Sequence, residues 1–149
     1  MPTGRFAPSP SAPLHLGNLR TALLAAGDDP AEQLVAVVKS NATLHATYPQ
    51  LAIVVNEELY ALPDELAGPA LALRQQSSAL LFDILHRGIE TGRFQCRSAL
   101  VTAAAIGAMG LRIPYFYEPW SGLEVAALAE LQAELALRMV DCVHIARRT

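Results

Sequence analysis

The side chains best suited to chemistry in this 149-residue chain are four histidines, at His15, His45, His86 and His144. No two of them have the close spacing of paired metal ligands. The two cysteines, Cys96 and Cys142, also lie far apart and form no CxxC or Cys/His motif. We therefore expect no metal site, no cofactor, and reduced thiols of the kind found in cytosolic proteins.

Acid–base and nucleophilic catalysis also lack a recognisable set of residues. Glu57 and Glu58 are adjacent carboxylates. Neighbours on a helix point in different directions, so we expect both side chains to be solvated. No Ser/His/Asp or Cys/His arrangement can be assembled from the spacing of the chain. The sequence thus predicts no catalytic residue and favours a protein that is not an enzyme.

A long helix is the most regular element that the sequence predicts. Between Leu62 and Phe94, apolar or small residues recur at steps of four and three, at Leu66, Ala70, Leu73, Ser77, Leu80 and Ile84. This is the period of a helix with one apolar face. Pro63 suits the start of the helix, and Gly92 suits a left-handed stop. Pro69 is discordant, and it either kinks the helix or marks its true start.

Four further helices are predicted around this one. Residues 29–32 combine an acidic N-cap with proline at the first helical position, and the helix that follows ends at Tyr48. Pro49 can open the next helix. Residues 98–113 predict another helix, closed by the proline after it, and a capping box at 121–124 leads into the last. The predicted fold class is therefore all-α, a helical bundle of about five long helices with a short irregular or strand-containing N-terminal segment.

Length and composition are those of one ordinary globular domain with a real core. The net charge of -3 argues against a nucleic-acid surface that covers the whole molecule. The least charged run, residues 98–111, is too short to span a bilayer. Prolines near the start replace the apolar run of a signal peptide. We therefore expect a cytoplasmic protein without a membrane anchor.

The first 27 residues differ in composition from the remainder. Prolines at positions 8, 10 and 13 allow only a short strand and a loop there, and the run GDDP at residues 27–30 breaks the chain. We therefore divide the chain into a segment at residues 1–27, which is not an independent domain, and a domain at residues 28–149.

Residues 4–25, GRFAPSPSAPLHLGNLRTALLA, resemble the opening of glutamyl-tRNA synthetases, including the HLGN form of their class I signature. The resemblance implies that Arg5 and Ser9 would bind the amino acid. It also implies that His15, Gly17 and Asn18 would face ATP. Backbone N–H groups at such a strand-to-helix turn can bind phosphate. Ala12 stands where the family has glycine, and no lysine-rich second signature follows. We therefore expect this motif to be vestigial.

From Asp29 onward the chain resembles the C-terminal regulatory domain of TetR-type transcription factors. Four stretches carry the resemblance: HATYPQLAIVVNEELYAL, ALRQQSSALLFDILHRGIETGRF, AAAIGAMGLRIPYFYEP and LEVAALAELQAELALRMV. It implies a homodimer in which the last two long helices form a four-helix bundle with a second subunit. The candidates for that interface are Ala103, Gly107, Leu128, Leu131, Leu135 and Met139.

In the same family the earlier helices enclose a small-molecule pocket, which implies a small apolar ligand here. The candidates for the lining are Leu73, Ser77, Leu81, Phe82, Met109, Tyr115 and Phe116. The aromatic residues among them could equally pack into the core, as apolar clusters after a helix commonly do.

The resemblance implies the ligand-sensing and dimerisation domain of a TetR-type transcriptional regulator that lacks its helix-turn-helix. No direct DNA binding is expected, because the few basic residues near the start do not form a recognition helix. Two alternatives remain: a glutamyl-tRNA synthetase-related fragment with vestigial ATP or glutamate binding, or a regulatory partner that forms inactive heterodimers.

Overall fold

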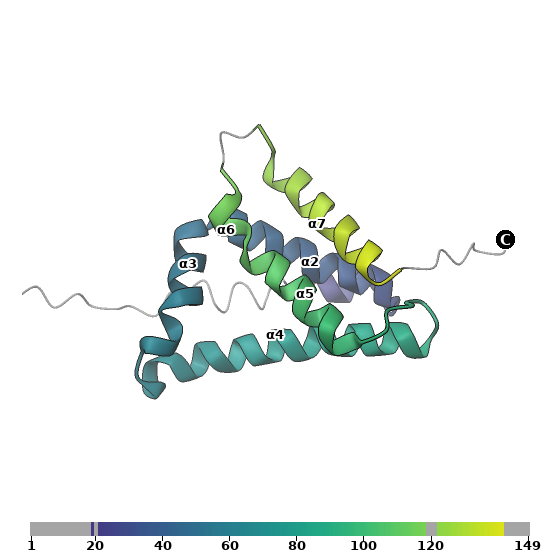
Figure 1. The fold of residues 1–149 in the computed structure, drawn as a ribbon, viewed down its shortest axis with the longest axis horizontal. Helices are drawn as coiled ribbons and strands as arrows, with labels where there is room; N and C mark the ends of the chain where they lie inside the picture. The colour runs from purple at the N-terminus through teal and green to yellow at the C-terminus, as the bar shows by residue number, and fades with distance from the viewer. Residues whose placement is uncertain (1–18, 20, 119–121, 142–149) are drawn as a thin grey trace, which may run out of the picture.

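The computed structural model describes residues 19, 21–118 and 122–141, and these form helices and no strand (Figure 1). Residues 21–25 are a short helical stretch. The main elements follow in the order α2 (Pro30–Thr47), α3 (Pro49–Glu57), η1 (Leu59–Ala61), α4 (Asp64–Glu90), α5 (Ala99–Leu111), α6 (Ile113–Phe116) and α7 (Val125–Met139). The all-α prediction is confirmed.

The start of α2 is capped as its sequence predicts. Asp29 is the N-cap, its Oδ1 accepts a hydrogen bond from the Ala31 N–H at 2.9 Å, and Pro30 occupies the first helical position. Tyr48 ends α2, and Pro49 begins α3 directly after it. The predicted Tyr-Pro break between these two helices is therefore confirmed.

Helix α4 is continuous over 27 residues and passes through Pro69. The helix begins ahead of this proline, at Asp64, so the interpretation of Pro69 as its true start is wrong. Proline here costs one backbone hydrogen bond, and the rest of the helix is long enough to tolerate that loss. Gly92 follows the helix with φ +70°, the left-handed conformation expected of it.

Two other boundaries differ from the predictions. The helix expected at residues 98–113 ends at Leu111, and Pro114 lies in the first turn of the separate helix α6. The last helix begins at Val125, with Glu124 itself at the N-cap and no side-chain cap bond. The predicted capping box is therefore wrong, because it requires Glu124 three residues inside the helix. Gly122 just before it has φ +75°.

Helix α2 is the centre of the fold and packs most extensively against α7, with α4, α5 and α6 also in contact (Figure 1). The main core joins α2, α4, α5 and α7, and its largest fully buried side chains are Leu34, Ile84, Leu85, Phe94 and Val140. A second core cluster lies between α2, α6 and the start of α7, and it contains Ala42, Ile113, Tyr117 and Leu128. Helix α3 and the first turns of α4 extend away from α7, on the left of the view in Figure 1.

Candidate functional site

The larger of two described hollows lies where α3, η1, α4 and the α5–α6 junction meet. We call it the polar cavity. Its volume is about 450 Å³, and its lining residues are Asn56, Tyr60, Arg74, Ser78, Leu111, Arg112 and Tyr115. In Figure 1, α3 and the first turns of α4 lie on the left side of the molecule, and the rest of α4 runs along the bottom of the view. The volume falls in the range of small-molecule sites, about 300–1,000 Å³.

One wall of the polar cavity is built on Arg74 of α4. Its Nη2 donates a hydrogen bond to Oδ1 of Asn56 on α3 at 2.5 Å, and its guanidinium carbon lies 6.0 Å from the centroid of the Tyr60 ring. The amide nitrogen of Asn56 is buried and has no hydrogen-bond partner among the described residues. This wall therefore presents a guanidinium and leaves a buried N–H donor unsatisfied.

A second part of the lining is built on Arg112 and Tyr115. The Arg112 guanidinium stacks over the Tyr115 ring, 4.4 Å from its centroid. The Tyr115 hydroxyl donates a hydrogen bond to Oε1 of Glu57 at 2.8 Å, and this bond raises the pKa of Tyr115, so the phenol stays protonated. Among the described residues neither Arg74 nor Arg112 has a carboxylate within 4.0 Å.

His45 on α2 is buried and adds no positive charge at neutral pH. Burial lowers its pKa from 6.5, and repulsion from Arg74 acts in the same direction. Its Nδ1 lies 2.8 Å from the carbonyl oxygen of Asn41, one turn earlier, and this bond partly opposes the shift. The field of Arg74 thus extends from the polar cavity to the core side of α2.

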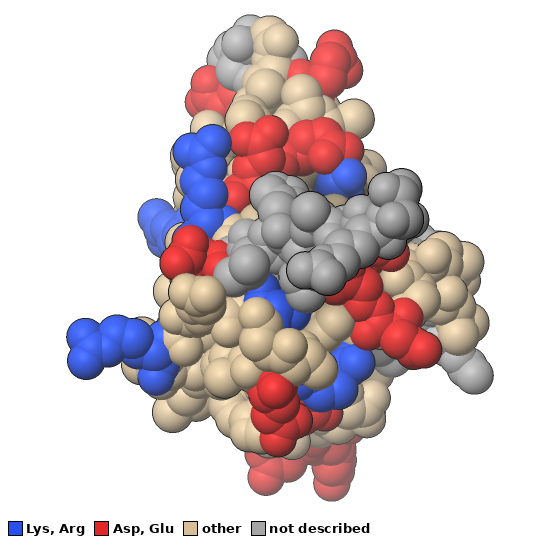
Figure 2. All heavy atoms as spheres, turned by 90° about the vertical axis from the view of Figure 1, so that its right-hand side faces the viewer, with Lys and Arg blue, Asp and Glu red and all other residues tan. Residues whose placement is uncertain are grey.

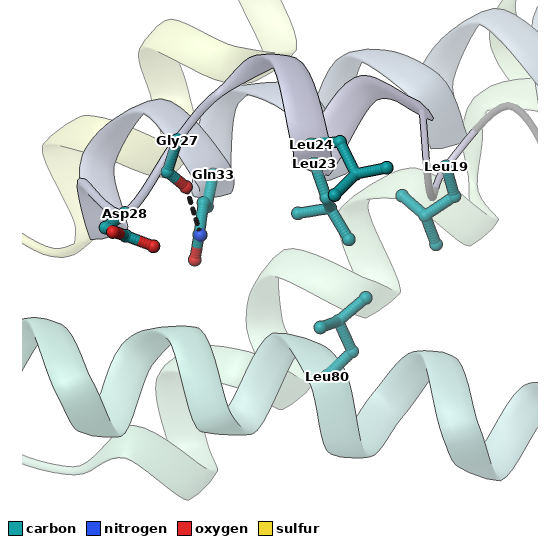
Figure 3. Close-up of a pocket in the computed structure, with 7 residues that line it drawn as sticks. All are labelled: Leu19, Leu23, Leu24, Gly27, Asp28, Gln33 and Leu80. Carbon is teal, nitrogen blue, oxygen red and sulfur yellow. Dashed lines mark hydrogen bonds between the residues drawn. The ribbon is translucent and has the colours of Figure 1, made fainter.

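A second hollow of about 370 Å³ lies between the residues ahead of α2 and α4. Leu19, Leu23 and Leu24 form one side, and Leu80 of α4 lies opposite them (Figure 3). The Gln33 amide donates to the Gly27 carbonyl at 2.5 Å and closes one end. This hollow is mainly apolar, and the leucines dock the preceding segment onto the long helix.

An apolar surface without a covering element among the described residues lies on α5 and α7. We call it the α5/α7 face. On α7 its members are Leu131, Leu135 and Met139, which are 47%, 45% and 42% exposed. On α5, Leu100 and Val101 are exposed, and a Cβ added at Gly107 would meet nothing within 4 Å. Exposed apolar side chains on two helices that contact each other mark a candidate surface for interaction with another molecule.

The α5 part of this face belongs to a longer apolar run. Ala99–Phe116 is long and apolar enough to cross a membrane by length and composition, and only 22% of it is buried within the subunit. The fold breaks the run at Arg112, between α5 and α6. Helix α5 alone is too short to span a bilayer, as expected, but the apolar run that continues through α6 is not. The described part of the subunit leaves most of this run uncovered.

The predicted interface residues do not all lie on the α5/α7 face. Leu128 is 3% exposed and packs in the subunit's own second core cluster, because the turn of α7 that carries it faces α2 and α6. Its assignment to an interface is therefore corrected. Ala103 is partly buried against the main core. Leu131, Leu135, Met139 and Gly107 remain available.

The predicted pocket residues also fall in different places. Of these, only Tyr115 lines the polar cavity. Leu81 is buried in the main core and Met109 packs against it, while Phe82 and Phe116 are exposed. Leu73 and Ser77 are half-buried on α4, with the Ser77 hydroxyl bonded to the Leu73 carbonyl at 3.0 Å. None of the other six lines either hollow.

The cavity's polar lining was missed because the predictions from sequence followed apolar periodicity. Arg74 and Arg112 carried a usable signal, since each is a lone cation within or directly after a long apolar helical run. Charged side chains are rarely fully buried, so each of these cations is expected at a surface or at the edge of the core. Neither the pairing of Arg74 with Asn56 nor the stacking of Arg112 on an aromatic ring follows from spacing, because those partners come from other helices.

Several predicted sites cannot be placed on this fold. The synthetase-like residues Arg5, Ser9, His15, Gly17 and Asn18 lie outside the described residues. Trp120, Cys142 and His144 do so as well. Within the described ranges no group of three or more His, Cys, Asp or Glu side chains could hold a metal ion. Figure 2 shows one face of the molecule, on which basic and acidic side chains are interspersed.

Residues 27–140 match the family described as "Tetracyclin repressor-like, C-terminal domain". The chain belongs to this family. No curated protein sequence matches it.

Solved structures of TetR-family proteins share the fold. A tetR-family regulatory protein from Rhodococcus RHA1 superposes with a TM-score of 0.71 and 24% identity, over 89% of this chain and 73% of that chain. The TetR family transcriptional regulator PfmR from Thermus thermophilus gives 0.71 and 23%, over 85% and 71%. A TetR-family regulator from Bordetella parapertussis gives 0.70 and 22%, over 85% and 66%. All three are named as TetR-family proteins, and at 22–24% identity they show that this chain shares their fold.

Proposed function

We propose that residues 27–140 are the ligand-sensing and dimerisation domain of a cytoplasmic TetR-type transcriptional regulator. The observation that carries the proposal is the α5/α7 face, which lies on the last two long helices of a domain in this family. The polar cavity, on the other side of the same subunit, supplies a place for a small molecule.

The α5/α7 face supports pairing with a second copy. Leu131 and Leu135 lie four residues apart on α7 and so form one stripe along the helix. Gly107 leaves open space on α5 into which a partner's side chain can pack. Two such helices from each subunit make a four-helix bundle that removes this surface from water.

A bilayer is a poorer partner for the same surface. Arg112 lies inside the apolar run, at the break between α5 and α6, where a spanning helix would have to place a charge in hydrocarbon. The chain's net charge of -3 also gives no general attraction to anionic lipids. A second subunit therefore fits this face better than a membrane.

Residues 27–140 would thus sense a ligand and bind a second subunit, and they would make no contact with DNA. An acidic chain without a basic stripe gains little from phosphate neutralisation. A reporter of DNA binding is therefore the wrong test for this region. The direct test is the molar mass of the purified chain, measured by light scattering during size-exclusion chromatography. We expect twice the chain mass of 16.0 kDa. A well-folded protein that stays monomeric at high concentration would rule out the dimerisation role.

A further inference from the structure

We propose that the polar cavity binds a small organic carboxylate, whose charged group is held by Arg74 and Arg112 and whose body packs on Tyr60, Tyr115 and Leu111. This inference rests on the proposed sensing function and names the chemical class of its ligand. It replaces the apolar ligand expected from the sequence.

The charge of the cavity favours an anion. Its lining contains two guanidinium groups and no carboxylate. Arg74 is half-buried and Arg112 is exposed, and neither is ion-paired among the described residues. His45 behind the Arg74 wall is held neutral by burial and contributes no charge. Two guanidiniums thus contribute positive charge to the lining, and among the described residues the only carboxylate bonded to a lining residue is that of Glu57.

Glu57 limits that ligand to a low charge. Its carboxylate accepts the Tyr115 hydroxyl at 2.8 Å and so lies at the edge of the Arg112 wall. The two guanidiniums and this one carboxylate together leave a single net positive charge. A monoanion balances it, whereas a phosphate dianion would meet repulsion from Glu57. A carboxylate is the organic monoanion that the planar fork of arginine matches best.

The hydrogen-bonding groups of the cavity are mainly donors. Arg74 uses one N–H on Asn56 and has further donors on its fork, while the Arg112 guanidinium stacks on the Tyr115 ring and forms no hydrogen bond to a described residue. The unpartnered amide nitrogen of Asn56 is one more donor at this wall. A ligand with two acceptor oxygens on one carbon therefore complements the cavity better than a hydroxyl or amine.

The uncharged lining residues determine which chemical groups the rest of the ligand can carry. Tyr60 and Tyr115 present aromatic rings, and Leu111 is the aliphatic member of the lining. A volume of about 450 Å³ accommodates a carboxylate with a single ring or a medium alkyl chain. The cavity thus favours an aromatic or fatty carboxylate over a free metabolite acid with several hydroxyl groups.

The test uses two carboxylates and their uncharged isosteres. Benzoate, octanoate, benzamide and octanamide are titrated into the purified full chain by isothermal calorimetry. We expect at least one carboxylate to bind, about tenfold or more tighter than its amide. Equal binding of acid and amide would overturn the anion assignment while leaving a ligand-binding role intact. Failure of all four to bind would overturn the assignment of the cavity as a carboxylate site.

Matched variants place the binding in the cavity. Arg74→Gln and Arg112→Gln should each weaken carboxylate binding by about tenfold or more, because each removes a charged fork from the lining. Arg138→Gln removes the same charge from an exposed position on α7 and should leave affinity unchanged. If neither cavity variant weakens binding more than Arg138→Gln does, the site lies elsewhere and the proposal fails.

Two further measurements on the same samples distinguish a failure of carboxylate binding from a failure of dimerisation. Circular dichroism on each variant shows whether the fold is kept, and Arg74→Lys and Arg112→Lys keep the charge where a glutamine variant is unstable. Light scattering gives the subunit number. A dimer that rejects both carboxylates retains the pairing role and loses the ligand class. A monomer that binds them with dependence on Arg74 and Arg112 retains the ligand class and loses the pairing role.

Discussion

The guanidinium of Arg93 holds the carboxylate of Asp29 with two hydrogen bonds, Nε to Oδ1 at 3.0 Å and Nη2 to Oδ2 at 3.1 Å. Asp29 caps the N-terminus of α2, and Arg93 lies in the connection after α4. One carboxylate therefore has two roles: it satisfies a free N–H at the start of α2 and fixes the end of the long helix beside it.

Replacement of Asp29 by alanine should lower the free energy of unfolding by about 1–3 kcal/mol, because both the cap and the Arg93 pair are lost. Arg93→Gln should cost less, since the cap to Ala31 remains. Asp28→Ala removes a neighbouring exposed carboxylate and serves as the control. Urea unfolding followed by circular dichroism measures all three. Equal stability of the Asp28 and Asp29 variants would contradict the double role.

Gly88→Ala should destabilise the domain by about 1–3 kcal/mol through overpacking. A Cβ at position 88 would lie 1.9 Å from Cδ2 of the buried Phe94 ring. That ring cannot easily retreat, because the Phe94 N–H bonds the Gly88 carbonyl at 2.9 Å. Gly68→Ala on the same helix meets nothing within 4 Å and should be neutral or stabilising by up to about 1 kcal/mol. Thermal melting of the pair tests this, and similar losses in both would contradict it.

Leu135→Glu should convert the dimer to a folded monomer, because it places a charge in the desolvated seam of the α5/α7 face. Ala126→Glu, on the solvent row of α7 with Glu130 and Glu134, should leave the dimer intact. Light scattering and circular dichroism distinguish dissociation from unfolding. An unchanged dimer in Leu135→Glu would place the interface elsewhere.

Leu128→Ala should behave differently from changes on that face. Its side chain is 3% exposed within the subunit core, so its truncation should lower the free energy of unfolding by about 2–5 kcal/mol. The effect should persist at protein concentrations where subunit association is saturated. Unfolding curves recorded at two concentrations measure it. A loss that disappears at high concentration would return Leu128 to the interface.

The melting temperature should fall on acidification partly because of His45. In the unfolded chain this histidine titrates near 6.5, and burial gives it a lower pKa in the fold. Its contribution to stability is therefore present above pH 6.5 and is lost as the pH falls from there to the folded pKa. His45→Gln should lose less stability than the parent between about pH 7 and pH 5. Identical pH profiles would contradict a neutral buried His45.

The Arg74→Gln change should also affect that profile. Removal of the guanidinium takes away a charge that opposes protonation of His45, so the folded pKa should move back toward 6.5. The acid loss of stability that His45 causes should then be smaller and should end at a higher pH than in the parent protein. The control is Arg138→Gln, on the exposed surface of α7. Differential scanning fluorimetry across a pH series measures both variants, and coincident profiles would contradict the coupling.

The sequence by itself determined the helices and most of their ends. Caps and stops are local devices, so Asp29, Pro49 and Gly92 could be assigned correctly from their neighbours alone. The family resemblance from Asp29 onward was likewise readable from the order and character of the helices. Of the two interpretations of Pro69, the helix start was wrong, and so was the capping box at Glu124, because the observed helices begin at Asp64 and at Val125.

Only the tertiary structure decided which face of each helix meets which neighbour. Leu128 and Leu131 belong to the same apolar pattern, yet one is buried in the subunit and the other is exposed, because α7 contacts α2 along one side only. The polar cavity likewise depends on Arg74, Asn56 and Arg112 converging from separate parts of the chain. Periodicity describes one helix at a time, whereas a binding site and an interface are properties of the surfaces that several helices form together.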